Sequence, residues 1–232
     1  MARRRGQDEL PVYLEVGKKR VFAGAIEWPG WSRSGKGDEA ALEALAAYGP
    51  RYAAALRGTR LGFDSPTDPS AFTVIERLGG DATTDFGAPG KAPAADDRAL
   101  DEEGARRTDA ILRASWEAFD AAVGAAQGKT LTKGPRGGGR DLDEIVRHVL
   151  EADRGYLARI GAKYQLSEGR DPRKELVRIR PMILGTLMAV ACGDPVRSGP
   201  RGGIRWTPRY FVRRSVWHVL DHAWEVEDRA VG

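Results

Sequence analysis

Hydrophobic and polar positions change over short distances in the first part of the chain. Two β-rich runs, Val12–Val16 and Val21–Ile26, flank the turn sequence Gly-Lys-Lys-Arg, which predicts a hairpin. From Asp38 to about Leu56 the apolar residues follow a helical period, and Phe72–Glu76 has the composition of a third strand. This pattern predicts a small α+β domain.

In the second part of the chain the apolar positions repeat with the period of a helix. The last stripe runs through Val212, Val216, Val219, Ala223 and Val226. No convincing strand interrupts the pattern, and four amphipathic helices of this length predict an all-α four-helix bundle. The expected helices cover about 102–126, 141–160, 172–192 and 208–229.

Composition along the chain suggests where these parts begin and end. The basic N-terminus has no apolar segment behind it, so it reads as a short disordered tail and not as a secretory signal. The residues between the two expected folds are rich in Gly, Pro, Ala, Asp and Thr, which is typical of a linker. The expected organisation is a tail (1–10), an α+β domain (11–80), a linker (81–100) and the bundle (101–232).

Cysteine content and hydropathy restrict the setting of the protein. The chain has 232 residues and no apolar run of about 18 residues, so we expect no transmembrane helix and no membrane partner. The single cysteine, Cys192, excludes an internal disulfide and indicates a reducing compartment, hence a cytoplasmic protein. Because Cys192 ends an apolar run, we expect a buried thiol in the core.

The net charge of +4 resides entirely in residues 99–232. It is concentrated in Lys129–Arg140 and in Arg197–Arg214, which contain no acidic residue. Such segments either keep a protein soluble or bind anions. The second segment lacks a recognised readout motif and has only scattered aromatic residues, so a nucleic-acid partner is not expected.

The three histidines of the chain form the most specific chemical pattern. His218 and His222 are four positions apart on the fourth expected helix, so they share a face. His148 lies on the second expected helix, and all three positions flank the apolar stripes. Their depths along the helices match if these two helices are antiparallel, as in an up-down-down-up bundle.

This arrangement resembles the DinB-like family (YfiT-type metal-dependent hydrolases and thiol-S-transferases) over about residues 100–232. The resemblance implies an up-down-down-up bundle with a three-histidine metal centre, whose ligands are His148, His218 and His222. It also implies a divalent transition metal (Zn, Ni, Mn or Fe), a small-molecule substrate and, for the transferase members, a low-molecular-weight thiol. Three neutral imidazoles leave coordination positions open, which is typical of a catalytic metal and not of a structural one.

Residues around the histidines extend this hypothesis. Glu144 and Glu225 are each about one turn from a histidine, so they are either carboxylates that orient the imidazoles or solvated helix acids. Asp141 and Glu144 have the spacing of a capping box. The preceding glycine-rich loop is a flexible linker or an anion site, in which Arg136 and Arg140 are the candidate substrate contacts.

A second apolar patch on the last expected helix comprises Trp217, Leu220 and Trp224. Two tryptophans away from the valine stripe imply that something covers them. The candidates are the first domain or a second subunit, so a homodimer is one interpretation.

The stretch from Trp28 to Leu45, in which strands are followed by Trp-Pro-Gly-Trp and then by Glu-Ala-Leu, is similar to HicB-like domains. This resemblance covers about residues 11–76 and implies only the fold. In antitoxins such a domain binds a toxin and precedes a DNA-binding module, whereas here an expected helical bundle follows.

Three functions are therefore compatible with the sequence. The first is a metal-dependent transferase or hydrolase of the DinB-like type. The second is a non-enzymatic regulatory module that binds nucleic acid or protein through Arg197–Arg214. The third is a metal-binding or stress-response protein that has kept the site without activity.

Overall fold

The computed structural model describes residues 9–66, 68–133, 139–193 and 205–231. The chain forms two compact units, Met1–Ala95 and Asp96–Gly232. Most of the expected N-terminal tail lies outside the described residues.

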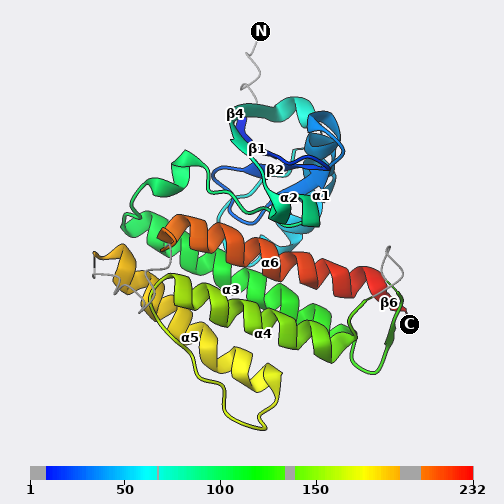
Figure 1. Cartoon of the computed structure of the whole chain (residues 1–232), viewed down its shortest axis with the longest axis vertical. Helices are drawn as coiled ribbons and strands as arrows, with labels where there is room; N and C mark the ends of the chain where they lie inside the picture. The colour runs from blue at the N-terminus through cyan, green and yellow to red at the C-terminus, as the bar shows by residue number, and fades with distance from the viewer. Residues whose placement is uncertain (1–8, 67, 134–138, 194–204, 232) are drawn as a thin grey trace. The chain divides into compact units, whose positions relative to one another are not determined.

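The first unit contains the expected hairpin in a four-stranded mixed sheet of order β3-β2-β1-β4 (Figure 1). Neighbouring strands are antiparallel except β1 and β4, which are parallel. A parallel pair needs a long crossover, and helix α1 lies within this one. The α+β class expected for this part of the chain is confirmed. The bounds are β1 Leu10–Val16, β2 Val21–Ala25, β3 Ser32–Gly35, α1 Asp38–Leu56 and β4 Phe72–Gly79.

Strand β3 was not expected, because its sequence, Ser-Arg-Ser-Gly, has no strand-forming side chains. It forms by pairing with β2 in antiparallel register from Val21 opposite Gly35 to Gly24 opposite Ser32. The Ser32 hydroxyl also donates to the carbonyl of Ala23, 3.0 Å away. Backbone pairing and this side-chain bond therefore override the local propensity.

Aromatic residues supply much of the core between the sheet and α1. Trp31 stacks on Tyr52 with 6.0 Å between ring centroids, and Phe63 meets both rings edge-on at 5.0 Å. The Trp31 indole donates to the carbonyl of Leu45 in α1, so its buried N–H is satisfied. The Trp-Pro-Gly-Trp stretch thus places its second tryptophan, Trp31, in the core.

Residues 81–95, expected as linker, belong to the first unit. They contain the short helix α2 (Ala82–Phe86), whose N-terminus is capped by Asp81 in a capping box. The fully buried carboxylate of Glu15 accepts from the Thr84 hydroxyl and from the amides of Gly90 and Lys91. A buried charge with three donors is compensated, so this carboxylate holds the segment against β1.

The second unit contains four long helices, close to the expected ranges (Figure 1). Their bounds are α3 Glu102–Ala125, α4 Leu142–Arg159, α5 Pro172–Ala191 and α6 Pro208–Arg229. The unit also contains two paired strands of two residues each, which the pattern did not predict. They are β5 (Thr130–Leu131) and β6 (Ala230–Val231). These strands are too short to leave a period in the sequence.

Hydrogen bonds at the helix ends give the helix directions. The Trp206 amide, before α6, donates to the carbonyl of Arg159 at the end of α4, and Arg229 at the end of α6 donates to the carbonyl of Arg140, before α4. Helices α4 and α6 are therefore antiparallel. Arg173 and Asp143, in the first turns of α5 and α4, form an ion pair, so these two helices are parallel.

Helix α3 runs in the direction of α6. Arg209 in the first turn of α6 donates to the carbonyls of Arg98 and Ala99, just before α3, while the Thr132 amide, after α3, donates to Arg229 at the end of α6. The four helices are consequently up, down, down and up, as Figure 1 shows through their colours.

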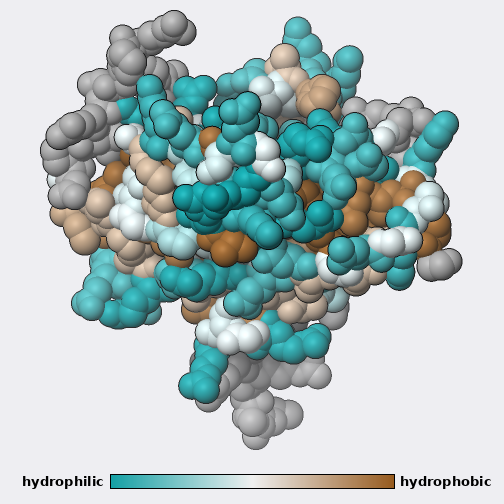
Figure 2. Space-filling view, turned by 90° about the horizontal axis from the view of Figure 1, so that it is seen from below, coloured by the Kyte–Doolittle hydropathy of each residue, from teal (hydrophilic) through white to brown (hydrophobic). Residues whose placement is uncertain are grey.

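The core of the second unit is made by the expected apolar stripes. In α6 the five residues of the valine stripe are fully buried. The buried side chains of the other helices include Ile111, Leu112, Phe119, Ile145, Val149, Leu157, Ile179, Ile183 and Leu187. Figure 2, which shows the molecule from below, has hydrophilic side chains over much of this face, with apolar areas between them.

Two expectations about single features have different outcomes. Cys192 is exposed, so the expectation of a buried core thiol is wrong. It lies at the C-cap of α5, beyond Leu187, the last buried residue of that helix. Within the described ranges, no helix has both the length and the apolar character needed to cross a membrane.

Candidate metal centre

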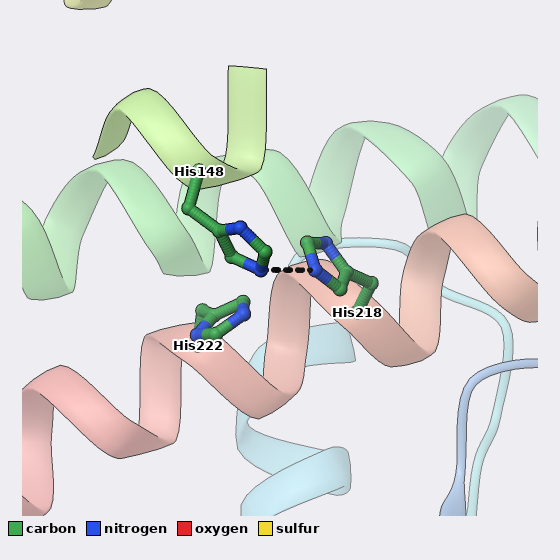
Figure 3. Close-up of side chains that lie close together, drawn as sticks. All are labelled: His148, His218 and His222. Carbon is green, nitrogen blue, oxygen red and sulfur yellow. Dashed lines mark hydrogen bonds between the residues drawn. The ribbon is translucent and has the colours of Figure 1, made fainter. Parts of the chain in front are cut away.

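The three histidines come together between α4 and α6 (Figure 3). A capping box formed by Asp141 and Glu144 begins α4 and so sets the helical position of His148. His218 and His222 project from consecutive turns of α6, and Figure 3 shows the three rings converging on one another. Because the two helices are antiparallel, the start of α4 meets the second half of α6.

The three rings lie close enough together that they could hold one metal ion. The Nε2 atoms of His148 and His218 are 3.2 Å apart, and one candidate ligand atom from each histidine lies within 4.8 Å of the others. Two nitrogens bound to one tetrahedral zinc ion at ordinary bond lengths are roughly 3.3 Å apart. The three ring centroids are 4.6, 4.9 and 5.0 Å apart, so the arrangement is nearly equilateral.

Burial favours the neutral, metal-binding form of two of the three imidazoles, those of His148 and His218. Desolvation lowers the pKa of His148 to about 4, with further lowering by His222 and Arg140. Burial also lowers the pKa of His218 well below its ordinary value, and the positive charge of Arg214 acts in the same direction. Metal binding requires neutral imidazole, so His148 and His218 lose no affinity to protonation near pH 7.

One of the two expected carboxylates contacts the histidines. The Oε2 atom of Glu225 lies 2.7 Å from Nδ1 of His222. The hydrogen bond from His222 lowers the pKa of Glu225 against the opposing effect of burial. An ionised carboxylate only accepts, so Nδ1 of His222 carries the proton and Nε2 is left as the ligand atom.

Of the other expected residues, Glu144 and Arg140 have hydrogen-bond partners away from the histidines. Glu144 is exposed, and its carboxylate accepts from the amide of Asp141 as the helix cap. The backbone carbonyl of Arg140 accepts from Arg229, and its exposed side chain acts on the histidines through its charge. Arg136 lies outside the described residues.

Residues that the pattern did not single out also border the histidines. The ring of Tyr156 meets His218 edge-on at 5.7 Å and is tilted against Trp206 at 5.1 Å. Arg214, one turn before His218, places its guanidinium carbon 4.6 Å from the ring centroid of Trp217 and 5.6 Å from that of Tyr156. Helical spacing from the histidines, 148 to 156 and 214 to 218, is the only signal that could have indicated them.

The arginine-rich segment serves the fold in the part that the structure describes. Arg213 forms a buried two-pronged ion pair with Asp96, and Arg209 donates to two backbone carbonyls. Arg205 donates to the carbonyl of Ala158. These three guanidinium groups already have hydrogen-bond partners within the second unit. This weakens the interpretation that the segment binds the phosphates of a nucleic acid.

No family model, curated protein or solved structure matches this chain. Conclusions about function therefore depend on the geometry and chemistry of the histidine cluster.

Proposed function

We propose that the protein is a metal-dependent enzyme of the DinB-like type. In this proposal a divalent transition metal (Zn, Ni, Mn or Fe) is held by His148, His218 and His222, and the reaction is thiol transfer or hydrolysis on a small substrate. The observation that carries the proposal is the 3.2 Å separation of the two Nε2 atoms within a nearly equilateral set of imidazoles.

Several independent features support a metal over a purely structural cluster. Imidazole nitrogens suit zinc and the neighbouring first-row metals, and Glu225 supplies the outer carboxylate that accompanies histidine ligands. A structural cluster of neutral imidazoles in this position would gain little, because each ring has a single N–H to donate. The helix order and the ligand positions also agree with the DinB-like resemblance.

The chemistry follows from an incomplete protein ligand set. A metal with three imidazole ligands and open positions supplies Lewis acidity, which activates water or a thiol near neutral pH. The protein's own residues orient the ligands: Glu225 contacts His222, and the ring of Tyr156 packs edge-on against His218.

The metal content of untagged protein tests the proposal. The wild type, after supply of Zn²⁺, Ni²⁺, Mn²⁺ or Fe²⁺ and gel filtration, should retain a stoichiometric metal, as measured by mass spectrometry. His148→Ala and His218→Ala should lose it, whereas Arg147→Ala, at an exposed position beside His148, should retain it. A wild type that holds none of these metals would rule the proposal out.

Activity separates an enzyme from a metal-binding protein without catalysis. Metal-loaded protein is assayed for thiol addition to small electrophiles and for hydrolysis of small amides and esters. Turnover that is abolished by a chelator and absent in His148→Ala supports the enzyme. The regulatory alternative instead requires nucleic-acid association with a steep salt dependence, and the commitment of Arg205, Arg209 and Arg213 argues against it.

A further inference from the structure

Arg229, the last residue of α6, joins three segments of the second unit although its side chain is almost fully buried. Its relative exposure is 7%. Each of its guanidinium nitrogens has a partner. Nη1 donates to Oε1 of Glu225 at 2.5 Å, Nε to the carbonyl of Thr132 at 2.8 Å and Nη2 to the carbonyl of Arg140 at 2.8 Å.

The backbone of Arg229 adds to this attachment. Its carbonyl accepts from the amide of Thr132 at 2.8 Å and from the hydroxyl of the same residue at 3.2 Å. Thr132 precedes the glycine-rich segment and Arg140 follows it. Both flanks of that segment therefore form hydrogen bonds with Arg229. These bonds and the contact with Glu225 fix the position of its side chain.

Gly139 gives a second, independent indication that this position is specific. A Cβ atom at Gly139 would lie 2.4 Å from Nη2 and 2.9 Å from the guanidinium carbon of Arg229. Because real Cβ atoms do not approach so closely, any other residue at position 139 would displace the guanidinium. The glycine thus leaves the space that Arg229 needs to reach the carbonyl of Arg140.

Glu225 transmits this position to the histidines. Its two oxygens have different partners, since Oε1 accepts from Arg229 and Oε2 lies 2.7 Å from Nδ1 of His222. The carboxylate is therefore held between a fixed cation and a candidate metal ligand. Without the cation, the partly buried Glu225 side chain would have several rotamers available.

We propose that Arg229 is the positioning residue of the histidine cluster: it fixes the Glu225 carboxylate so that His222 keeps its proton on Nδ1 and presents Nε2 to the metal. This inference rests on the proposed metal function for its role, and on the contacts of Arg229, Glu225 and His222 for its geometry.

Arginine is required here and lysine does not replace it. The planar guanidinium has donors in a fixed fork, which matches three acceptors in different directions. Lysine carries the same charge on a single nitrogen and lacks the fixed fork of donors that serves Glu225, Thr132 and Arg140 together. Arg229→Lys therefore separates the charge of the residue from its geometry.

The tautomer of His222 in the metal-free protein tests the inference directly. In the full-length chain, ¹⁵N NMR of the imidazoles near pH 8 should show His222 as the Nδ1–H tautomer in the wild type. Arg229→Gln and Gly139→Ala should shift His222 towards a mixture of the Nδ1–H and Nε2–H tautomers. Arg229→Lys should give a result between that of the wild type and that of these two variants. Arg147→Gln, at an exposed position on α4, should leave the spectrum unchanged.

Metal affinity provides the second measurement, by competition with a chromogenic chelator for Zn²⁺. Loss of an outer carboxylate partner typically costs roughly 10- to 100-fold in metal affinity, so Arg229→Gln should weaken binding within this range. A folded Arg229→Gln with the wild-type tautomer and affinity would overturn the inference. If that variant does not fold, Gly139→Ala decides in the same way, because it displaces the guanidinium without deleting it.

The two proposals fail in different ways. If the wild type binds no metal, the proposed function is wrong and the tautomer of His222 alone decides the role of Arg229. If the wild type binds metal and the Arg229 and Gly139 variants leave tautomer and affinity unchanged, the proposed function stands and Arg229 has a structural role only.

Discussion

The Nε2 atoms of His148 and His218 lie 3.2 Å apart although 70 positions separate the two residues in the chain. In the metal-free neutral state one of these nitrogens donates to the other, so the pair forms a single N–H···N hydrogen bond. A metal ion would instead bind both lone pairs, and it would bind the folded state preferentially because these nitrogens converge only in the fold. The metal should therefore stabilise the folded second unit.

Thermal stability measures this effect. A ligand that binds only the folded state at 100 times its Kd adds about 2.7 kcal/mol, which raises Tm by roughly 5–10 °C for a unit of this size. We expect such a rise on adding Zn²⁺ to the wild type, and none with His148→Ala or His222→Ala. An equal rise in these variants would show that the ion binds elsewhere.

The two candidate carboxylates should respond differently to neutralisation. Glu225→Gln should lower Zn²⁺ affinity by roughly 10- to 100-fold, because it loses the ionised partner of His222. Glu144→Gln should leave the affinity unchanged and weaken only the cap of α4, by about 1 kcal/mol or less. Chelator competition and urea unfolding of both variants distinguish the two roles, and equal affinities would contradict the assignment of Glu225.

Asp153 of α4 should give the second unit an unusual pH dependence. Burial raises its pKa to about 7, against a smaller lowering by Arg180. The folded chain thus keeps a proton that the unfolded chain releases above pH 4. The stabilisation from this proton is complete below the unfolded pKa, and it is lost as the pH rises through 7.

Asp153→Asn removes this dependence, since the amide does not ionise. Relative to the wild type, the variant should gain stability on the order of a few kcal/mol between pH 4 and pH 8. Urea unfolding followed by helical circular dichroism at several pH values measures the difference. For Glu151→Gln, on the exposed face of α4, the free energy of unfolding should change with pH as it does in the wild type. The same pH dependence in Asp153→Asn would refute the prediction.

The buried pair of Arg213 and Asp96 should matter far more than an exposed pair. Both side chains are under 10% exposed and are joined by two hydrogen bonds of 2.7 Å. Arg213→Ala leaves a buried carboxylate without its cation, which typically costs about 3–5 kcal/mol. Arg106→Ala, which breaks an exposed i,i+4 pair with Glu102, should cost less than about 1 kcal/mol.

Unfolding in urea, analysed as one transition for each unit, compares these variants. A loss below about 1 kcal/mol for Arg213→Ala would mean that the carboxylate of Asp96 reaches water or another donor in the variant.

Helices and their ends were predictable because their signals are local. The period of the apolar stripe in α6, the capping box at Asp141 and the proline at the start of α5 act within a few residues of their own positions. The i,i+4 spacing of His218 and His222 is local in the same sense, and so is the hairpin of β1 and β2. These features follow from backbone geometry and hydrophobic periodicity alone.

Strand pairing and burial at element ends required the tertiary structure. β3 has no strand-like composition and forms only because β2 offers an edge. Cys192 continues an apolar run but lies past the last turn that the core covers, so it is exposed. A sequence pattern records the character of a residue but not the position where a neighbouring element ends.

The candidate site shows the same division. By itself, the sequence determined the helical positions of the three histidines and the presence of an acidic residue about one turn from His148 and from His222. Only the tertiary structure decided that Glu225 contacts a histidine while Glu144 caps its own helix, and that Arg229 holds Glu225. These outcomes depend on the antiparallel packing of α4 against α6, because contacts between distant segments are set by the fold and not by spacing along the chain.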